Sequence, residues 1–203
     1  MKQAPAPVPA DVALIVSEVW ASFVDGVTNR HSVFHTPTVA TMAADGSPSL
    51  RTVVLRAADP ELRLIRFHTD LRSRKVSEIA REPRVSVHVY DPRAKIQVRL
   101  SGRAVAKPIG AGGEVAWDAS RRKSLFCYGI APGPGTPIPE GGAYHMPTEE
   151  HEIDGGAPNF TAVEVTIDGF EWVFLHVAGH RRAGFTWNGN ASGGQWVGTW
   201  MVP

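Results

Sequence analysis

Cysteine is almost absent from this chain of 203 residues, which contains only Cys127. One thiol cannot form an internal disulfide, so disulfide-stapled secreted scaffolds are excluded and a cytoplasmic location is expected. Long apolar runs are also missing: stretches such as 12–16 are far shorter than the roughly 20 residues that a membrane-spanning helix needs, so we expect no membrane partner. Residues 1–10 place prolines where a signal peptide has its apolar region, and they are predicted to form a flexible tail.

The chain also has little net charge, with 21 Lys and Arg residues against 20 Asp and Glu residues. These charges are nevertheless segregated along the sequence. Residues 51–103 contain 13 basic and 6 acidic side chains, whereas residues 131–171 contain 8 acidic side chains and no Lys or Arg. Such a basic segment can meet nucleic acid, an anionic lipid surface or a small phosphorylated ligand, and it can equally be an ordinary solvated surface.

Hydrophobic periodicity predicts a mainly β, α+β fold in a single domain spanning residues 1–203. Six or seven short strands with a few helices favour one closed or nearly closed antiparallel barrel with peripheral helices. Residues 131–160 contain six Pro and six Gly, so we expect a long Gly/Pro-rich loop there. Helices are expected over 12–27, 73–82 and 114–128, and strand-like runs over 38–43, 50–57, 62–68, 84–90, 95–106, 160–167, 171–176 and 195–202.

One segment carries the features that phosphate binding requires. A strand ends at Thr69, a short loop follows, and a helix opens with Ser73, Arg74 and Lys75. A helix start offers free backbone N–H groups and the positive end of the helix dipole, while the side chains add a hydroxyl and two cations. The same pattern also occurs where a serine merely caps an exposed helix.

Further motifs surround this segment in a characteristic order. They are Arg-Thr-Val-Val-Leu-Arg at 51–56, Phe-His-Thr-Asp-Leu-Arg-Ser-Arg-Lys at 67–75, Gln-Val-Arg-Leu-Ser-Gly at 97–102 and, more loosely, His-Arg-Arg at 180–182 with the terminal Trp-Met-Val-Pro. Together they resemble the pyridoxamine 5'-phosphate oxidase-related family of FMN-binding split barrels. The central motifs fit along residues 38–107.

The resemblance implies an antiparallel FMN-binding split β-barrel that forms a homodimer with FMN at the interface. It implies an FMN-dependent oxidoreductase acting on a small-molecule substrate or reductant. Residues implied to line the flavin, hold its phosphate or hydrogen-bond its ring are Arg51, Val53, Val54, Leu55, Arg56, His68, Thr69, Ser73, Arg74, Lys75, Gln97 and, packing from the partner subunit, Trp172.

The chain departs from the oxidase proper near its C-terminus. That enzyme carries an Arg-X-His pair for the substrate phosphate and a further Arg before a Phe. Here Arg181 and Arg182 remain as substrate-binding candidates, Ala183 takes the place of the histidine, and Gly184 precedes the Phe. We therefore expect a substrate other than pyridoxamine phosphate, with its identity unassigned.

Two alternatives share the same basic segment. A non-catalytic flavin carrier or sensor would use the same binding residues. A barrel that binds single-stranded nucleic acid would need aromatic residues interleaved with the charges, and residues 51–103 contain only Phe67 and Tyr90, so no nucleic-acid partner is expected. No metal site is expected either, because the spacing of His145 and His151 does not fit a metal-binding helix.

Overall fold

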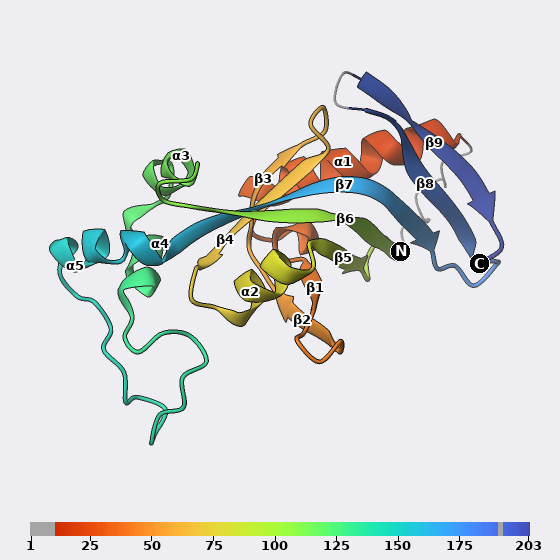
Figure 1. The fold of residues 1–203 in the computed structure, drawn as a ribbon. Coiled ribbons are helices and arrows are strands. Elements are labelled where there is room, and N and C mark those ends of the chain that lie inside the picture. The colour runs from red at the N-terminus through yellow and green to blue at the C-terminus, as the bar shows by residue number, and fades with distance from the viewer. Residues whose placement is uncertain (1–10, 191–192) are drawn as a thin grey trace.

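The computed structural model describes residues 11–190 and 193–203, and the tail predicted at residues 1–10 lies outside them (Figure 1). The protein is mostly antiparallel sheet flanked by helices, so the predicted fold class is confirmed. The helices are α1 (Val12–Thr28), η1 (Val33–His35), α2 (Arg74–Arg81), α3 (Glu114–Asp118), α4 (Arg122–Leu125), η2 (Phe126–Gly129), α5 (Glu150–Gly155) and η3 (Ala157–Asn159). The strands are β1 (Thr38–Met42), β2 (Pro48–Thr52), β3 (Leu55–Asp59), β4 (Leu64–Asp70), β5 (Arg84–Asp91), β6 (Ile96–Pro108), β7 (Phe160–Phe174), β8 (Arg181–Asn190) and β9 (Gly193–Met201).

The long strand β7 organises the sheet. The strand order is β2-β1-β5-β6-β7-β4-β3, and β8 and β9 continue from β7 on a second path. One edge of β7 pairs with β6, while the other pairs with β4 through residues 160–166 and with β8 through residues 169–174. The sheet therefore divides at β7, which separates a curled barrel from the β8–β9 hairpin (Figure 1).

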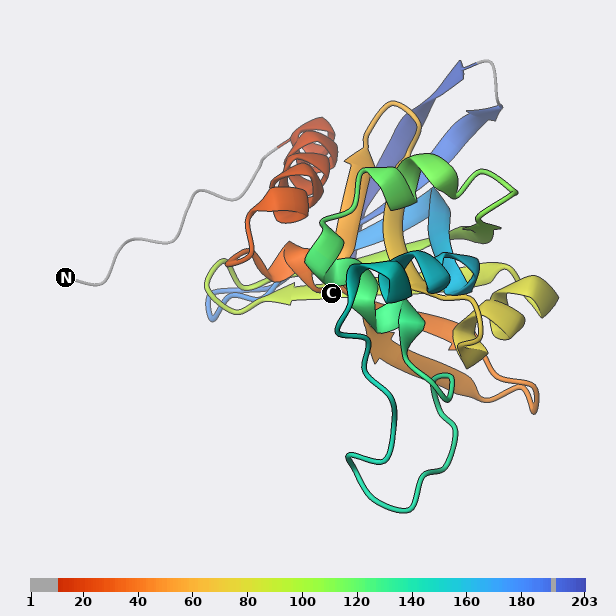
Figure 2. The same cartoon turned by 90° about the vertical axis from the view of Figure 1, so that its left-hand side faces the viewer.

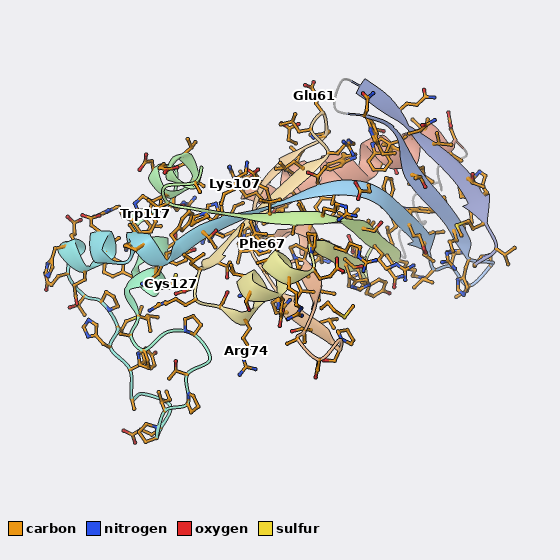
Figure 3. All side chains as sticks on the ribbon, viewed as in Figure 1. Glu61, Phe67, Arg74, Lys107, Trp117 and Cys127 are labelled. Carbon is orange, nitrogen blue, oxygen red and sulfur yellow. The ribbon has the colours of Figure 1, made fainter. Side chains whose placement is uncertain are left out.

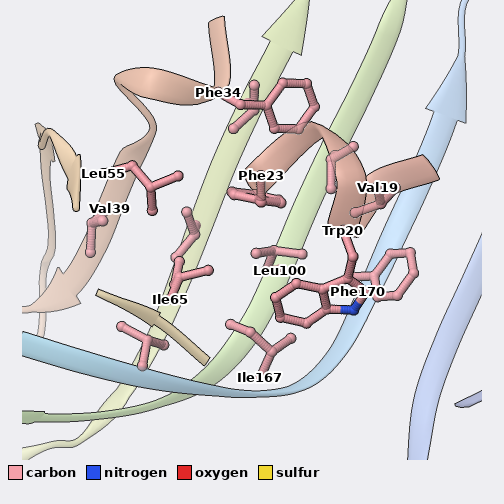
Figure 4. Close-up of a cluster of buried hydrophobic side chains, with 14 of the residues drawn as sticks. Val19, Trp20, Phe23, Phe34, Val39, Leu55, Ile65, Leu100, Ile167 and Phe170 are labelled. Carbon is pink, nitrogen blue, oxygen red and sulfur yellow. The ribbon is translucent and has the colours of Figure 1, made fainter. Parts of the chain in front are cut away.

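Helix α1 forms as its sequence predicts. The Asp11 side chain accepts a hydrogen bond from the Ala13 amide at 2.8 Å and caps the helix. Apolar residues at helical spacing, including Ile15, Val19 and Phe23, then face the main hydrophobic core. That core also includes Leu100 and Ile167 from β6 and β7 (Figure 4). Within the described residues, no helix is long and apolar enough to cross a membrane.

A second, smaller hydrophobic cluster lies at the start of β7. Phe160 packs edge-on against Trp117 and Tyr128, with ring centroids 5.3 Å and 5.1 Å apart. Leu125 and Ile153 complete its buried apolar lining. This cluster fixes α3, α4, α5 and η2 against one end of the sheet (Figure 2).

Several predicted boundaries are wrong. The run 50–57 is two strands, because the chain leaves the barrel edge at β2 and re-enters at β3, at the other end of the strand order. The helix expected over 114–128 is broken into α3, α4 and η2. The loop expected over 131–160 contains α5 and η3; α5 has a capping box in which Glu149 and Glu152 satisfy the helix start.

Two further differences concern the last strands. The run 160–167 and residues 171–174 of the run 171–176 belong to a single strand, β7, because a bulge near Asp168 absorbs the irregularity without ending the strand. Strand β8 was not predicted, although Ala183 and Phe185 alternate there between exposed or half-buried neighbours. Its glycines obscure this pattern.

Candidate functional site

The end of β4 and the start of α2 form the centre of the site. Thr69 and Ser73 are both buried, and their hydroxyl oxygens lie 3.4 Å apart. Lys75, in the first turn of α2, donates to Thr69 Oγ1 at 2.9 Å. The Ser73 hydroxyl donates to the carbonyl of Asp70 at 2.6 Å and makes no capping hydrogen bond to the helix. The positive end of α2 therefore lies beside two hydroxyls and an ammonium, which suits a phosphate group.

Arg51 reaches α2 from strand β2. Its guanidinium donates to Glu78 Oε2 at 2.9 Å, to Ser49 Oγ at 2.6 Å and to Thr41 Oγ1. Thr41 in turn donates to the same Glu78 oxygen at 2.5 Å. Burial alone would raise the pKa of Glu78, but hydrogen bonds from Thr41 and Arg51, together with the charge of Arg51, outweigh it and lower the pKa. A buried, charged network thus fixes Arg51.

The cationic side chains of Lys75 and Arg51 lie close enough to repel each other. Burial, followed by repulsion from Arg51, lowers the pKa of the Lys75 ammonium, although Asp70 and Glu78 oppose this shift. An anion bound between the two cations would reverse both effects, because it would replace lost solvation and offset their repulsion.

The two remaining predicted phosphate ligands are more exposed. Arg74 points from α2 away from the sheet into solvent (Figure 3). Arg56 sits where the β3–β4 ladder shifts register between Leu55 and Ala57, and it is also exposed. Both arginines are accessible to a ligand in this structure.

His68 lies on the opposite face of β4 from Thr69. Its ring contacts Phe160 edge-on at 4.9 Å, and its Nδ1 lies 3.3 Å from Ser120 Oγ. The buried Nε2 has no hydrogen-bond partner among the described residues. Burial, with additional repulsion from Arg56 and Arg66, lowers the pKa of His68 to about 4. At neutral pH the imidazole is therefore uncharged.

The segment predicted to line the flavin occupies the break between β2 and β3. The side chains of Val53 and Leu55 are buried in the main core, and Val54 between them is half-buried. The Val53 amide donates to the Pro37 carbonyl at 2.9 Å. This segment joins the strand that carries Arg51 to the strand that carries Arg56.

The structure does not bring Gln97 and Trp172 to the phosphate-like centre within one chain. Thr69 pairs with Thr161 at the start of β7, whereas Gln97 pairs with Val173 near its end. Trp172 is only 2% exposed and packs with Phe174 and Trp200. These predicted site residues are therefore separated from Thr69 by most of the length of β7 (Figure 1).

A charged cluster marks this second end of β7. Glu171 accepts hydrogen bonds from Arg99 and from Arg182, each at 2.5 Å. A cavity of about 830 Å³ opens beside them and is lined also by Gly184. Arg181 is exposed.

The side-chain directions on β8 clarify the departure from the oxidase motif. Ala183 is fully buried in the core, whereas Gly184 lines the open cavity. Because strand side chains alternate in direction, a residue at 183 points away from the cavity that Gly184 faces. A side chain at position 183 therefore points into the core, where it cannot bind a ligand in this cavity as the histidine of the oxidase motif would.

Sequence reasoning missed the residues that hold the site residues in place. They are Thr41 and Glu78, which hold Arg51, and Asp70 and Arg72, which form an ion pair at 2.7 Å within the β4–α2 loop. One available signal was the position of Glu78, three residues after Lys75 and hence on the same helix face.

The fold is that of the FMN-binding split barrels. Residues 17–107 match the family model described as the FMN-binding domain of pyridoxamine 5'-phosphate oxidase. This match covers the β4–α2 centre and Arg51. The resemblance seen in the sequence to the pyridoxamine 5'-phosphate oxidase-related FMN-binding family is therefore confirmed over residues 17–107, and the cofactor of the matched domain is FMN.

Curated relatives agree with this family. The chain is 34% identical to pyridoxine/pyridoxamine 5'-phosphate oxidase 2 of Arabidopsis thaliana over 108 residues, or 49% of this chain and 53% of the relative. It is 29% identical to pyridoxine/pyridoxamine 5'-phosphate oxidase of Gluconobacter oxydans (strain 621H) over 159 residues, or 75% and 78%. The match to the Arabidopsis protein thus spans about half of that relative's length.

Solved structures share the fold at lower identity. A pyridoxamine 5'-phosphate oxidase-related, FMN-binding protein from Nostoc punctiforme PCC 73102 superposes with a TM-score of 0.70 at 19% identity, covering 98% of this chain and all of that one. PhzG from Burkholderia lata 383, solved in complex with tetrahydrophenazine-1-carboxylic acid, gives a TM-score of 0.65 at 18% identity, covering 96% and 94%. Likeness at this identity extends to the fold.

Proposed function

We propose that the chain is an FMN-dependent oxidoreductase that holds the FMN phosphate at the start of α2. The observation that carries this proposal is the uncapped start of α2, where the Lys75 ammonium donates to Thr69 Oγ1 and the Thr69 and Ser73 hydroxyls lie 3.4 Å apart; the charge of Arg51 also acts on Lys75. A phosphate dianion would accept hydrogen bonds from Lys75 and from the hydroxyls of Thr69 and Ser73. Charge-assisted bonds of this kind are worth about 1.5–3 kcal/mol each.

The other predicted residues have roles that follow from their positions. Arg74 and Arg56 are exposed cations that can close over the phosphate and its surroundings, and neutral His68 adds no charge at pH 7. The backbone at 53–55 would line the flavin. When bound, FMN supplies the hydride or electron transfer, while the protein binds it and admits a substrate.

A homodimer would complete the site. Gln97, Arg181 and Arg182 lie at the opposite end of β7 from Thr69, so a twofold partner would bring this second group to the phosphate-like centre. Trp172 lies at the same end, but its side chain is 2% exposed and packs in the core of its own chain. Exposed apolar side chains on β9, among them Val197 and Met201, are available for burial in such an interface.

The substrate is proposed to be a small molecule other than pyridoxamine phosphate. Ala183 faces the core and Gly184 opens a cavity where the oxidase motif expects ligand-binding side chains. The proposed location is the cytoplasm, where a single free cysteine is stable.

The central test is the colour and turnover of the purified protein. We expect protein purified from cells to be yellow and to release FMN, not FAD, on denaturation. Reduction of the bound flavin by NADH, NADPH or a small organic donor, followed by reoxidation in repeated turnovers, would support an oxidoreductase. Bound FMN without turnover for any donor and acceptor pair would instead favour a flavin carrier, and a colourless protein without flavin affinity would refute the proposal.

A further inference from the structure

Arg72 lies inside the proposed phosphate loop, where its guanidinium pairs with the side chain of Asp70. Its Nε donates to Asp70 Oδ1 at 3.0 Å and its Nη2 donates to Asp70 Oδ2 at 2.7 Å. The Asp70 Oδ1 atom also accepts from the Arg72 amide at 2.8 Å, which closes a tight local turn. Asp70 is buried, so this two-pronged pair is held in one geometry.

The same guanidinium reaches a distant part of the chain. Arg72 Nη2 donates to the carbonyl of Ile130 at 3.0 Å and lies 3.5 Å from that of Tyr128. A second link runs parallel to it, because the Leu71 amide donates to the Asn159 carbonyl at 2.6 Å and Asn159 Nδ2 donates to the Tyr128 carbonyl at 2.8 Å. The phosphate loop is thus joined to the segment that follows η2.

That segment is the base of a projecting loop. Ala131 and His145 exchange two backbone hydrogen bonds, of 3.3 Å and 2.8 Å, so residues 132–144 form an excursion that we call the arm. Figure 2 shows the arm extending away from the rest of the protein. At its base, a Cβ on Gly133 would lie 3.2 Å from Arg72 Nε, so Gly133 packs directly on the Arg72 side chain.

We propose that Arg72 is a positioning residue that couples occupancy of the FMN phosphate site to the conformation of the arm. This inference rests on the proposed function. Thr69 and Ser73 carry the hydroxyls proposed to bind the phosphate, whereas Arg72, between them in sequence, contacts the base of the arm at Ile130 and Gly133. A phosphate that fixes the backbone of this loop also fixes Arg72 and, through it, the base of the arm. Phosphate binding and docking of the arm then share one conformational-entropy cost, that of ordering the loop that carries Arg72.

Thermodynamic linkage makes the coupling reciprocal. If FMN favours the docked base of the arm, then the docked base must increase FMN affinity by the same factor. Riboflavin lacks the phosphate and does not fix the loop, so its affinity should not depend on Arg72.

The chain contains a matched control for Arg72. Arg84 forms the same kind of two-pronged pair with Glu82, two residues before it, at 2.8 Å and 2.7 Å. That pair follows the other end of α2 and is remote from the arm. Comparison of Arg72→Ala with Arg84→Ala therefore separates the proposed coupling from the general loss of an arginine–carboxylate pair.

The experiment measures flavin affinity and arm cleavage in the full chain. Dissociation constants for FMN and riboflavin are obtained from quenching of flavin fluorescence. Arm accessibility is followed by cleavage after the exposed residues Glu140 and Tyr144, with a glutamate-specific protease and chymotrypsin, at zero and saturating FMN. Circular dichroism confirms that each variant is folded.

We expect FMN to slow arm cleavage at least threefold in the wild-type protein and not at all in Arg72→Ala. We also expect Arg72→Ala to weaken FMN about five- to thirtyfold, while riboflavin changes less than twofold and Arg84→Ala changes neither. Wild-type protein that binds FMN with no change in cleavage, or an Arg72→Ala variant that keeps FMN-dependent protection, would overturn the coupling. Wild-type protein that does not bind FMN would instead refute the proposed function.

Discussion

Glu78 Oε2 accepts a hydrogen bond from Arg51 Nη2 at 2.9 Å, which joins α2 to β2 beside the proposed phosphate site. The carboxylate is 6% exposed and also accepts from the Thr41 hydroxyl. The pair cannot gain much from Coulomb attraction after its desolvation cost. Its structural consequence is a fixed direction for Arg51 and a fixed position of α2 relative to β2.

Loss of the Glu78 charge should therefore destabilise the protein. In Glu78→Gln the shape remains, but the half-buried Arg51 charge loses its counterion. We expect the free energy of unfolding in urea at pH 7 to fall on the order of 3 kcal/mol. Glu82→Gln, which breaks an exposed pair with Arg84, should cost much less. Equal losses in the two variants would contradict a special role for the buried pair.

Lys75 should discriminate FMN from riboflavin. Lys75→Gln removes a half-buried ammonium that the phosphate would use, so we expect FMN to bind about 10- to 100-fold more weakly, equivalent to one charge-assisted hydrogen bond. Riboflavin should change less than about threefold. Flavin fluorescence titrations provide both constants. Arg93→Ala, which removes one exposed positive charge from the turn between β5 and β6, should leave both constants unchanged, and equal weakening of both ligands by Lys75→Gln would indicate lost folding instead.

The parts of this site that could be predicted are those whose residues lie close together in the sequence. Thr69, Ser73 and Lys75 lie within seven consecutive residues, so turn and helix rules alone place them together. The partnership of Arg51 with Glu78 depends on how the barrel curls, which periodicity does not determine. The separation of Gln97 from Thr69 likewise depends on strand register along β7.

The fold likewise divides into elements set by local sequence patterns, which could be predicted, and elements set by distant contacts, which could not. Helix α1 and hairpins with clear alternation were predicted well, because their patterns are local. The 114–160 region was not, because composition alone does not reveal that Glu152 accepts hydrogen bonds from the amides of Thr148 and Glu149 and starts α5. The prediction divides strand β7 at residues 168–170, because the bulge that keeps it continuous depends on its pairing with Ser101 and Gly102.

His68 should make the stability depend on pH between about 4 and 6.5. Its pKa is lowered to about 4 in the folded protein, so the unfolded chain binds this proton more readily. Stability from the neutral, buried ring is therefore complete above its usual pKa and is lost as the pH falls towards 4. Between pH 7 and pH 5 we expect a loss of about 1 to 2 kcal/mol from this group.

The measurement compares urea unfolding of wild-type protein and His68→Phe at pH 7 and pH 5. Phenylalanine preserves the aromatic contact with Phe160 and cannot titrate. The variant should show the smaller loss on acidification, with a difference of about 1 to 2 kcal/mol from wild type. If both proteins lose the same free energy, His68 does not account for the pH dependence.

The open face of the β8–β9 hairpin should control dimer formation and, with it, flavin affinity. Val197 lines the 830 Å³ cavity and is 46% exposed in the single chain. If this face meets a second copy, Val197→Glu would bury an unpaired carboxylate there and favour the monomer.

Val177→Glu is the matched control, because Val177 lies in the β7–β8 connection and is 94% exposed. Light scattering coupled to size exclusion should show a dimer for wild type and Val177→Glu, and a monomer for Val197→Glu. The Val197→Glu variant should also bind FMN at least about tenfold more weakly, because Gln97 and Arg182 no longer reach the phosphate site of the partner. A monomeric Val197→Glu protein with unchanged FMN affinity would show that each chain forms a complete flavin site alone.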